Sequence, residues 1–222
     1  MPMATFSAPP SDELRDPWSG GRCIDCGRDS HLIDQDRRCY SCHERYVRKS
    51  AHLGDLPKAI PERYRAALLQ DCALPTELIG WKGEPWAVVL QGPNGVGKSW
   101  LAARLAVHAA RSERLLMLWV SAADIVMGLR RAVAGNAEPP LPLWIEAELL
   151  VIDDIASARE TEHVVESLRY LIEARYDHCR PTIVTTDRPL SEVFEPRLAS
   201  RLREGIVLVL SGPDHREKQK RK

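Results

Sequence analysis

The stretch of this sequence best suited to chemistry is a glycine-rich run that ends in a lysine and a serine. Such a run lets backbone N–H groups turn toward phosphate oxygens, while the lysine adds positive charge near the β and γ phosphates and the serine hydroxyl can ligate Mg²⁺. An apolar run precedes it and a helical pattern follows it, as a P-loop requires. This setting argues against a chance glycine-rich turn and predicts a nucleotide-binding site. The residues are Gly92, Pro93, Asn94, Gly95, Val96, Gly97, Lys98 and Ser99.

A pair of adjacent acids forms the second candidate part of the same site. Asp153 and Asp154 follow the apolar run 149–152, so that a buried strand delivers them at its carboxyl end, the Walker B arrangement. Asp153 is expected to hold Mg²⁺, directly or through water, and Asp154 to orient or deprotonate an attacking water. The alternative, a pair of solvated turn residues, is disfavoured by the upstream P-loop. Asp187 follows a further buried strand expected at 181–186 in the same way, where polar side chains would face the γ phosphate.

Two CxxC pairs near the start of the chain predict a zinc site. Twelve residues separate them, a spacing that lets two tight turns present four thiolates to one tetrahedral Zn²⁺. Because protein thiolates fill all four positions, the site is expected to be structural and not catalytic. A redox CxxC is the alternative, but the βαβ surroundings of such a motif are missing. The predicted ligands are Cys23, Cys26, Cys39 and Cys42.

The surface of this cysteine module leaves two interpretations open. Arginines surround the cysteines together with Tyr40 and Tyr46, a combination compatible with charge and stacking contacts to single-stranded nucleic acid. Several aspartates and Glu44 offset that charge locally, so a surface that docks another protein is an equal alternative.

The candidate residues need a scaffold, and apolar runs that alternate with helical patterns predict one. Strands are expected at 86–90, 115–120, 149–152, 181–186 and 206–210, with helices between them. Such alternation indicates a parallel sheet. The predicted fold class is therefore α/β, a P-loop NTPase with a central parallel sheet, joined to a small N-terminal zinc-ribbon-like module.

The positions of prolines and of charged segments divide the chain into four expected parts. They are a flexible leader at 1–20, the four-cysteine zinc module at 21–50, the P-loop domain at 58–216 and a basic tail at 217–222.

The overall charge and hydropathy exclude several classes of protein. Lys and Arg together number 31, as do Asp and Glu, so nucleic-acid contacts must come from local patches and not from a global field. No apolar run has transmembrane length, and the start of the chain lacks the basic and apolar parts of a signal peptide. We therefore expect a cytoplasmic protein without a membrane partner.

Taken together, the motifs resemble the AAA+ helicase loaders of bacteria and their phages, of the DnaC and DnaI type, with the transposition ATPase IstB as a close relative. The resemblance covers roughly residues 58–216. The cysteine module also resembles the zinc-bearing N-terminal domains with which some loaders grip the replicative helicase. Beyond the P-loop, the resemblance rests on IPERYR at 60–65, VIDDI at 151–155, ARY at 174–176, PTIVTT at 181–186, ASRL at 199–202 and SGPDHR at 211–216.

This resemblance implies that the nucleotide is ATP and that the protein is an ATPase. It places Asp187 at the sensor-1 position and Arg201 at the arginine finger, which acts on ATP bound to a neighbouring subunit and so implies a homo-oligomer. It also directs the helix expected at 122–131, with Arg130 and Arg131, toward single-stranded DNA. Asp187 stands where the family usually has asparagine, and a negative charge near phosphates either weakens hydrolysis or indicates another arrangement of the site.

From the resemblance we expect an ATP-dependent DNA replication factor that loads or remodels a replicative helicase on single-stranded DNA, with ATP binding and hydrolysis as the switch. Two alternatives stay open. One is an IstB-like transposition ATPase that works with a transposase, distinguished by stable assembly on duplex DNA. The other is a non-hydrolysing, ATP-binding zinc adaptor, distinguished by the absence of ATP turnover. A small-molecule kinase is disfavoured because the sequence has no arginine-rich lid pattern.

Overall fold

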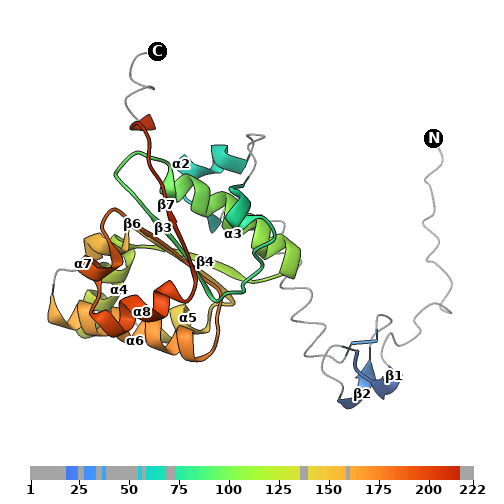
Figure 1. The fold of residues 1–222 in the computed structure, drawn as a ribbon. Coiled ribbons are helices and arrows are strands. Elements are labelled where there is room, and N and C mark those ends of the chain that lie inside the picture. The colour runs from blue at the N-terminus through green and yellow to red at the C-terminus, as the bar shows by residue number, and fades with distance from the viewer. Residues whose placement is uncertain are drawn as a thin grey trace, which may run out of the picture. The chain divides into compact units, whose positions relative to one another are not determined.

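The chain divides into two compact units, Met1–Ala51 and His52–Lys222. A computed structural model describes residues 19–24, 28–33, 37–38, 55–56, 59–68, 74–135, 140–158 and 161–215 (Figure 1). In the smaller unit, strands β1 (Ser19–Arg22) and β2 (Asp29–Ile33) pair antiparallel. Strand β1 begins before the expected start of the cysteine module at residue 21. The rest of the expected leader, residues 1–18, and the expected tail at 217–222 lie outside the described residues.

A parallel sheet of five strands, in the order β4-β5-β6-β3-β7, forms the centre of the larger unit. Each strand coincides with one of the expected apolar runs. Strands β5 and β6 are buried at every position, because helices cover both faces of the sheet. The predicted α/β class is thereby confirmed. The strands are β3 (Ala87–Gln91), β4 (Met117–Ser121), β5 (Leu149–Asp153), β6 (Thr182–Thr186) and β7 (Ile206–Val209).

Successive strand residues point to opposite faces of the sheet, and each face has its own layer of buried apolar side chains. Helices lie on both sides of the sheet (Figure 1). Val88 and Leu90 pack with the long helix α3 (Lys98–Glu113) and with Leu78 of the short helix η2 (Thr76–Leu78). Helix α2 (Glu62–Arg65) and the short helix η1 (Ala66–Leu68) adjoin this layer. Val89 packs into the opposite layer. That layer contains α4 (Ala122–Val133), α5 (Leu141–Glu146), η3 (Ile155–Ala158), α6 (Glu162–Asp177), α7 (Leu190–Val193) and α8 (Pro196–Arg203).

A buried arginine ties this second layer to the sheet. Arg175 of α6 is fully buried, and its guanidinium donates hydrogen bonds of 2.6–2.9 Å to five uncharged oxygens. Three are carbonyl oxygens at the C-terminal end of α5, which have no partner within their own helix. The other two belong to Pro181 and Thr182 at the start of β6. Burial, and to a lesser degree the charge of Arg180, lowers the pKa of Arg175 to about 9, so the group stays charged at neutral pH.

The strand order decides where a site can form. Parallel strands bring their carboxyl ends to one edge of the sheet, and β6 lies between β5, which ends in Asp153, and β3, which leads into the P-loop. The P-loop, the two adjacent acids and the end of β6 therefore meet at this edge. Among the helices in the described ranges, none is long and apolar enough to cross a membrane.

Candidate functional site

A cavity of about 540 Å³ opens where these carboxyl ends meet. It contains most of the residues that the sequence predicted for the nucleotide site: part of the P-loop with Lys98 and Ser99, and both acids, Asp153 and Asp154. Residues from three further segments complete the wall. The lining residues are Arg63, Tyr64, Asn94, Gly95, Gly97, Lys98, Ser99, Trp100, Asp153, Asp154, Thr185 and His215.

The P-loop has the backbone shape that its sequence predicts. Gly95 (φ 80°) and Gly97 (φ 99°) adopt left-handed conformations, which a residue with a Cβ rarely tolerates. A Cβ on Gly95 would also collide with the carboxylate of Asp214. Gly97 is the N-cap residue of α3, so the free N–H groups and the positive end of the helix dipole face the cavity. An anionic phosphate is the ligand that such a helix end favours.

Lys98 is held at this loop by backbone carbonyls. Its Nζ donates to the carbonyl oxygens of Gly92 (2.7 Å) and Pro93 (2.9 Å), and the side chain is 7% exposed. A buried ammonium requires such partners, because burying the charge without them would cost about 3 kcal/mol or more. Phosphate oxygens can replace the carbonyls as acceptors, since Lys98 lines the same cavity.

Asp153 is positioned by two hydroxyl groups. Ser99 Oγ donates to Asp153 Oδ1 at 2.6 Å, and Thr185 Oγ1 donates to the same oxygen at 2.7 Å. Asp153 is only 3% exposed, so these bonds replace lost hydration. A serine hydroxyl beside a carboxylate offers the hard oxygen ligands that Mg²⁺ prefers. The residues at this point therefore fit a magnesium ion bound together with a phosphate.

Asp154 has an unusual backbone conformation. Its φ is 60°, a left-handed value that aspartate adopts more readily than most residues but at some conformational cost. Its N–H donates to Thr185 Oγ1 (2.8 Å), and Ser157 Oγ donates to Asp154 Oδ2 (2.6 Å). These contacts fix Asp154 in the wall of the cavity.

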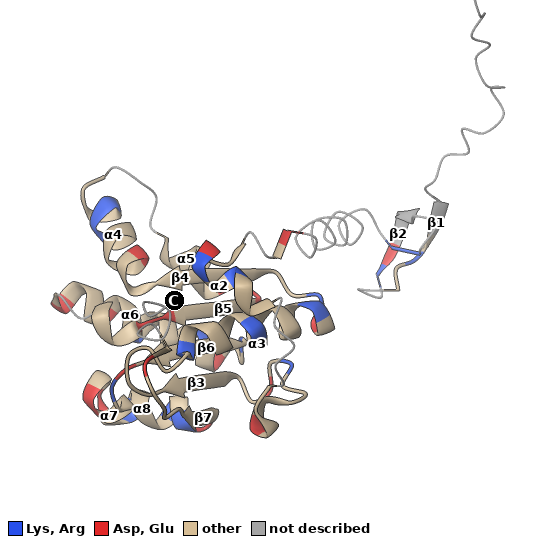
Figure 2. Ribbon diagram, turned by 90° about the horizontal axis from the view of Figure 1, so that it is seen from above, with Lys and Arg blue, Asp and Glu red and all other residues tan. Residues whose placement is uncertain are grey.

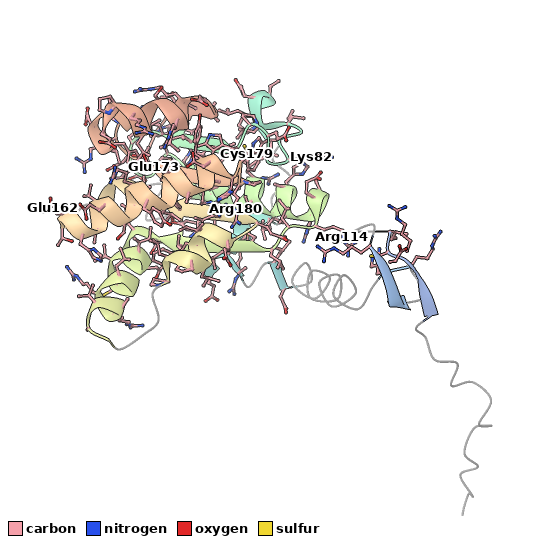
Figure 3. All side chains as sticks on the ribbon, turned by 90° about the horizontal axis from the view of Figure 1, so that it is seen from below. Lys82, Arg114, Glu162, Glu173, Cys179 and Arg180 are labelled. Atoms are coloured by element: carbon pink, nitrogen blue, oxygen red, sulfur yellow. The ribbon has the colours of Figure 1, made fainter. Side chains whose placement is uncertain are left out.

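The structure does not bring Asp187 and Arg201 into this wall. Asp187 follows β6 as expected, but it is not among the lining residues, and within the described part of the chain its buried Oδ1 has no hydrogen-bond partner. Arg201 of α8 lies with Nη1 3.1 Å from Glu173 Oε1, and its guanidinium stacks over the ring of Tyr176 at 4.7 Å. Glu173 is labelled on α6 in Figure 3. In this chain Arg201 thus connects two helices and does not touch the chain's own cavity.

Five other lining residues received no individual role from the sequence. Arg63 and Tyr64 come from α2, Trp100 from α3, Thr185 from β6, and His215 from the segment after β7, where its N–H donates to Gly95 O at 3.0 Å. The signal was present in part, because the motifs at 60–65, 181–186 and 211–216 contain four of them. Their place at one cavity depends on how segments far apart in sequence pack together.

The cysteine module is described in part. Cys23 is buried, its N–H donates to Arg28 O (2.9 Å), and Ile24 N–H donates to Arg37 O (2.9 Å). The first bond joins the residue after β1 to the residue before β2, and the second reaches a residue after β2. Cys26, Cys39 and Cys42 lie outside the described residues, so the zinc site stays a prediction.

The helix expected to approach DNA is present as α4. Arg130 and Arg131 are exposed in its last turn, and Figure 2 shows this positive charge at the end of the helix. Contact with DNA stays a prediction.

Comparison of the sequence with known proteins shows which family it resembles. The family model described as "IstB-like ATP binding protein" matches residues 77–200. The insertion sequence ATP-binding protein y4pL of Sinorhizobium fredii is 32% identical over 179 residues, which are 74% of this chain and 72% of that protein. The ATP-binding protein of insertion sequence IS232 from Bacillus thuringiensis is 30% identical over 125 residues, which are 54% of this chain and 49% of that protein.

Solved structures show the same fold. The DnaC helicase loader superposes with a TM-score of 0.59 at 20% identity, covering 68% of this chain and all of the other (100%). DnaI gives a TM-score of 0.55 at 19% identity, covering 72% and 98%. Domain III of the replication initiator DnaA from Thermotoga maritima gives 0.55 at 21% identity, covering 71% and 65%.

Proposed function

Because the chain belongs to the IstB-like ATP-binding family of AAA+ proteins, we propose that it is the ATPase partner of a transposase, which assembles on duplex DNA when ATP is bound. The observation that supports ATP as ligand most directly is the single cavity that contains Lys98, Ser99, Asp153 and Asp154. Support for transposition comes from the relatives y4pL and the IS232 protein, whose names assign both to insertion sequences.

The helicase-loader role expected from the sequence receives less support. DnaC and DnaI share the fold, but at 20% and 19% identity this likeness says nothing about the partner. The transposition alternative is the one that the more similar relatives favour. Binding to a replicative helicase and to single-stranded DNA is therefore an alternative to be tested and not the leading expectation.

Hydrolysis is proposed to follow from the arrangement of the cavity. Bound Mg²⁺ would supply charge neutralisation on the β and γ phosphates. Ser99 and Asp153 would hold the ion, and Lys98 would bind phosphate oxygens in place of the P-loop carbonyls. Asp154 would accept a hydrogen bond, and then the proton, from the attacking water, since its carboxylate lines the same cavity.

A second subunit is proposed to complete this site. Arg201 lies outside its own cavity, as the role across subunits implied by the resemblance requires. To reach a neighbour's ATP its guanidinium would have to exchange Glu173 and the Tyr176 ring for phosphate oxygens. Because this contact needs bound ATP, ATP would favour the proposed assembly, and hydrolysis or release of ATP would weaken it.

The test is sedimentation and electron microscopy of the full chain with duplex or single-stranded DNA, with ATP, ADP or no nucleotide. We expect oligomers on duplex DNA with ATP and their loss with ADP, together with ATP turnover that duplex DNA stimulates. Assembly on single-stranded DNA alone, with turnover that a replicative helicase stimulates, would instead support the loader. Tight ATP binding without turnover or DNA assembly would support the adaptor.

Zinc is proposed for the cysteine module, with Cys23, Cys26, Cys39 and Cys42 as ligands. Elemental analysis of the purified chain is expected to give about one zinc ion per chain, as a four-thiolate structural site binds one ion. The variant Cys42→Ser should lose most of this zinc. Cys179→Ser is the matched control, because Cys179 is an exposed cysteine of the other unit (Figure 3). Full zinc content in Cys42→Ser would contradict the proposed ligand set.

A further inference from the structure

The end of β6 contains a threonine whose hydroxyl makes a hydrogen bond to each of the two acids. Thr185 is fully buried (0% exposed), yet it contributes to the cavity wall between the P-loop and the Walker B strand. Its Oγ1 donates to Asp153 Oδ1 (2.7 Å) and accepts from the N–H of Asp154 (2.8 Å). One hydroxyl thus connects the side chain of one acid to the backbone of the next.

A count of protons explains what this threonine can and cannot do. A hydroxyl has a single proton to donate, and Thr185 gives it to Asp153. It therefore has none left for a phosphate oxygen. Both hydroxyl donors to Asp153, those of Ser99 and Thr185, reach Oδ1, so Oδ2 stays available for a cation or its water.

The bond to Asp154 acts on a strained position. The left-handed φ of Asp154 is unfavourable for a non-glycine residue and persists only where its surroundings hold it. Thr185 holds the N–H of this residue, and Ser157 holds its carboxylate. Loss of the threonine hydroxyl would take away the acceptor of a half-buried N–H and would release the backbone that holds Asp154 in the cavity wall.

We propose that Thr185 is a positioning residue for both acids, and that β6 acts on the nucleotide site through Thr185 and not through Asp187. The inference rests on the proposed binding of ATP with Mg²⁺ at this cavity. Asp187, in contrast, lies outside the cavity wall, although the resemblance assigns it the sensor-1 role. Thr185 acts on the bound nucleotide only through Asp153 and Asp154.

The test is calorimetric titration of the full chain with ATP, with and without MgCl₂. In the wild type we expect Mg²⁺ to raise ATP affinity at least about 10-fold, the usual size of one charge-assisted contact. In Thr185→Val, which keeps the shape and removes the hydroxyl, this gain should fall to about 2-fold or less, while affinity without Mg²⁺ stays within about 2-fold of wild type. Thr185→Ser, which keeps the hydroxyl, should retain the gain.

Asp187→Asn is the comparison on the same strand end, and the gain should persist there. Melting temperatures check that the variants fold, and Thr185→Ala replaces Thr185→Val if the valine variant unfolds. A magnesium gain in Thr185→Val equal to that of the wild type would overturn this inference alone. The absence of ATP binding in the wild type would overturn the proposed function, and the inference with it. Where turnover is measurable, kcat of Thr185→Val should fall about 10-fold or more, and KM for ATP in the presence of Mg²⁺ should rise about 5-fold, in step with the lost magnesium gain.

Discussion

Replacement of Lys98 by alanine is expected to weaken ATP binding at least about 100-fold, or about 3 kcal/mol. Lys98 is 7% exposed and its Nζ is bonded to two P-loop carbonyls, so the group is largely desolvated and placed before the nucleotide arrives. Phosphate oxygens would replace these carbonyls, and the charge on both partners makes the new bonds stronger than the old ones. Alanine removes both the charge and the donor.

The measurement is ATP affinity by calorimetry at fixed Mg²⁺ concentration. Lys82→Ala is the matched control, because Lys82 is an exposed lysine that pairs with Glu113 at 3.1 Å (Figure 3). Its loss should change ATP affinity by less than about 2-fold, as expected for an exposed ion pair. Lys98→Ala also removes the donor to Gly92 O and Pro93 O, so its melting temperature must be compared with that of the wild type. ATP affinity within about 3-fold of wild type in a folded Lys98→Ala protein would refute the P-loop assignment.

Replacement of Arg175 by methionine is expected to destabilise the larger unit by about 3–5 kcal/mol. Methionine fills a similar volume but takes a donor away from five buried or half-buried oxygens, four of them backbone carbonyls; Ile145 O keeps a second donor, Arg180 Nη1, at 2.6 Å. Three of these end α5, so the contact of this helix with α6 and β6 should loosen first. For a unit of this size the loss corresponds to a fall in Tm of about 10 °C.

Thermal unfolding followed by circular dichroism measures this effect. Arg169→Met on the exposed side of the same helix is the control and should shift Tm by no more than about 2 °C, since exposed substitutions rarely exceed about 0.5 kcal/mol. The Tm of Arg175→Lys should lie between those of the other two variants, because a lysine keeps the charge but has three protons for five acceptors. A Tm of Arg175→Met close to that of Arg169→Met would show that the buried guanidinium contributes little net stability, as some buried charges do.

Local patterns in the sequence predicted much of the site and the fold. The P-loop at 92–99 and the acids Asp153 and Asp154 are contiguous motifs whose geometry follows from glycine placement and from the strand before each. The strands could be predicted because each is an apolar run bounded by polar or helical segments, and their parallel order follows from that alternation. These features depend on residues a few positions apart.

Only the tertiary structure decided which of the polar residues at the end of β6 faces the cavity. The sequence favoured Asp187, but Asp187 lies beyond the end of β6, whereas the register of β6 against β5 brings Thr185 beside Asp153, to which its hydroxyl donates. The same holds for Arg175, which the sequence presented only as part of a motif. Its five acceptors come from segments that lie near each other only after α5 and β6 have packed against α6.

The sequence by itself thus determined the fold class and the phosphate-binding chemistry, since both depend on the types and spacing of residues a few positions apart. The tertiary structure decided which side chains meet: Thr185 with both acids, His215 beside the P-loop, and Arg201 with Glu173 and not with its own cavity. The physical reason is that hydrogen bonds and ion pairs act over a few ångströms in space. Sequence distance does not report that separation once a chain has folded back on itself.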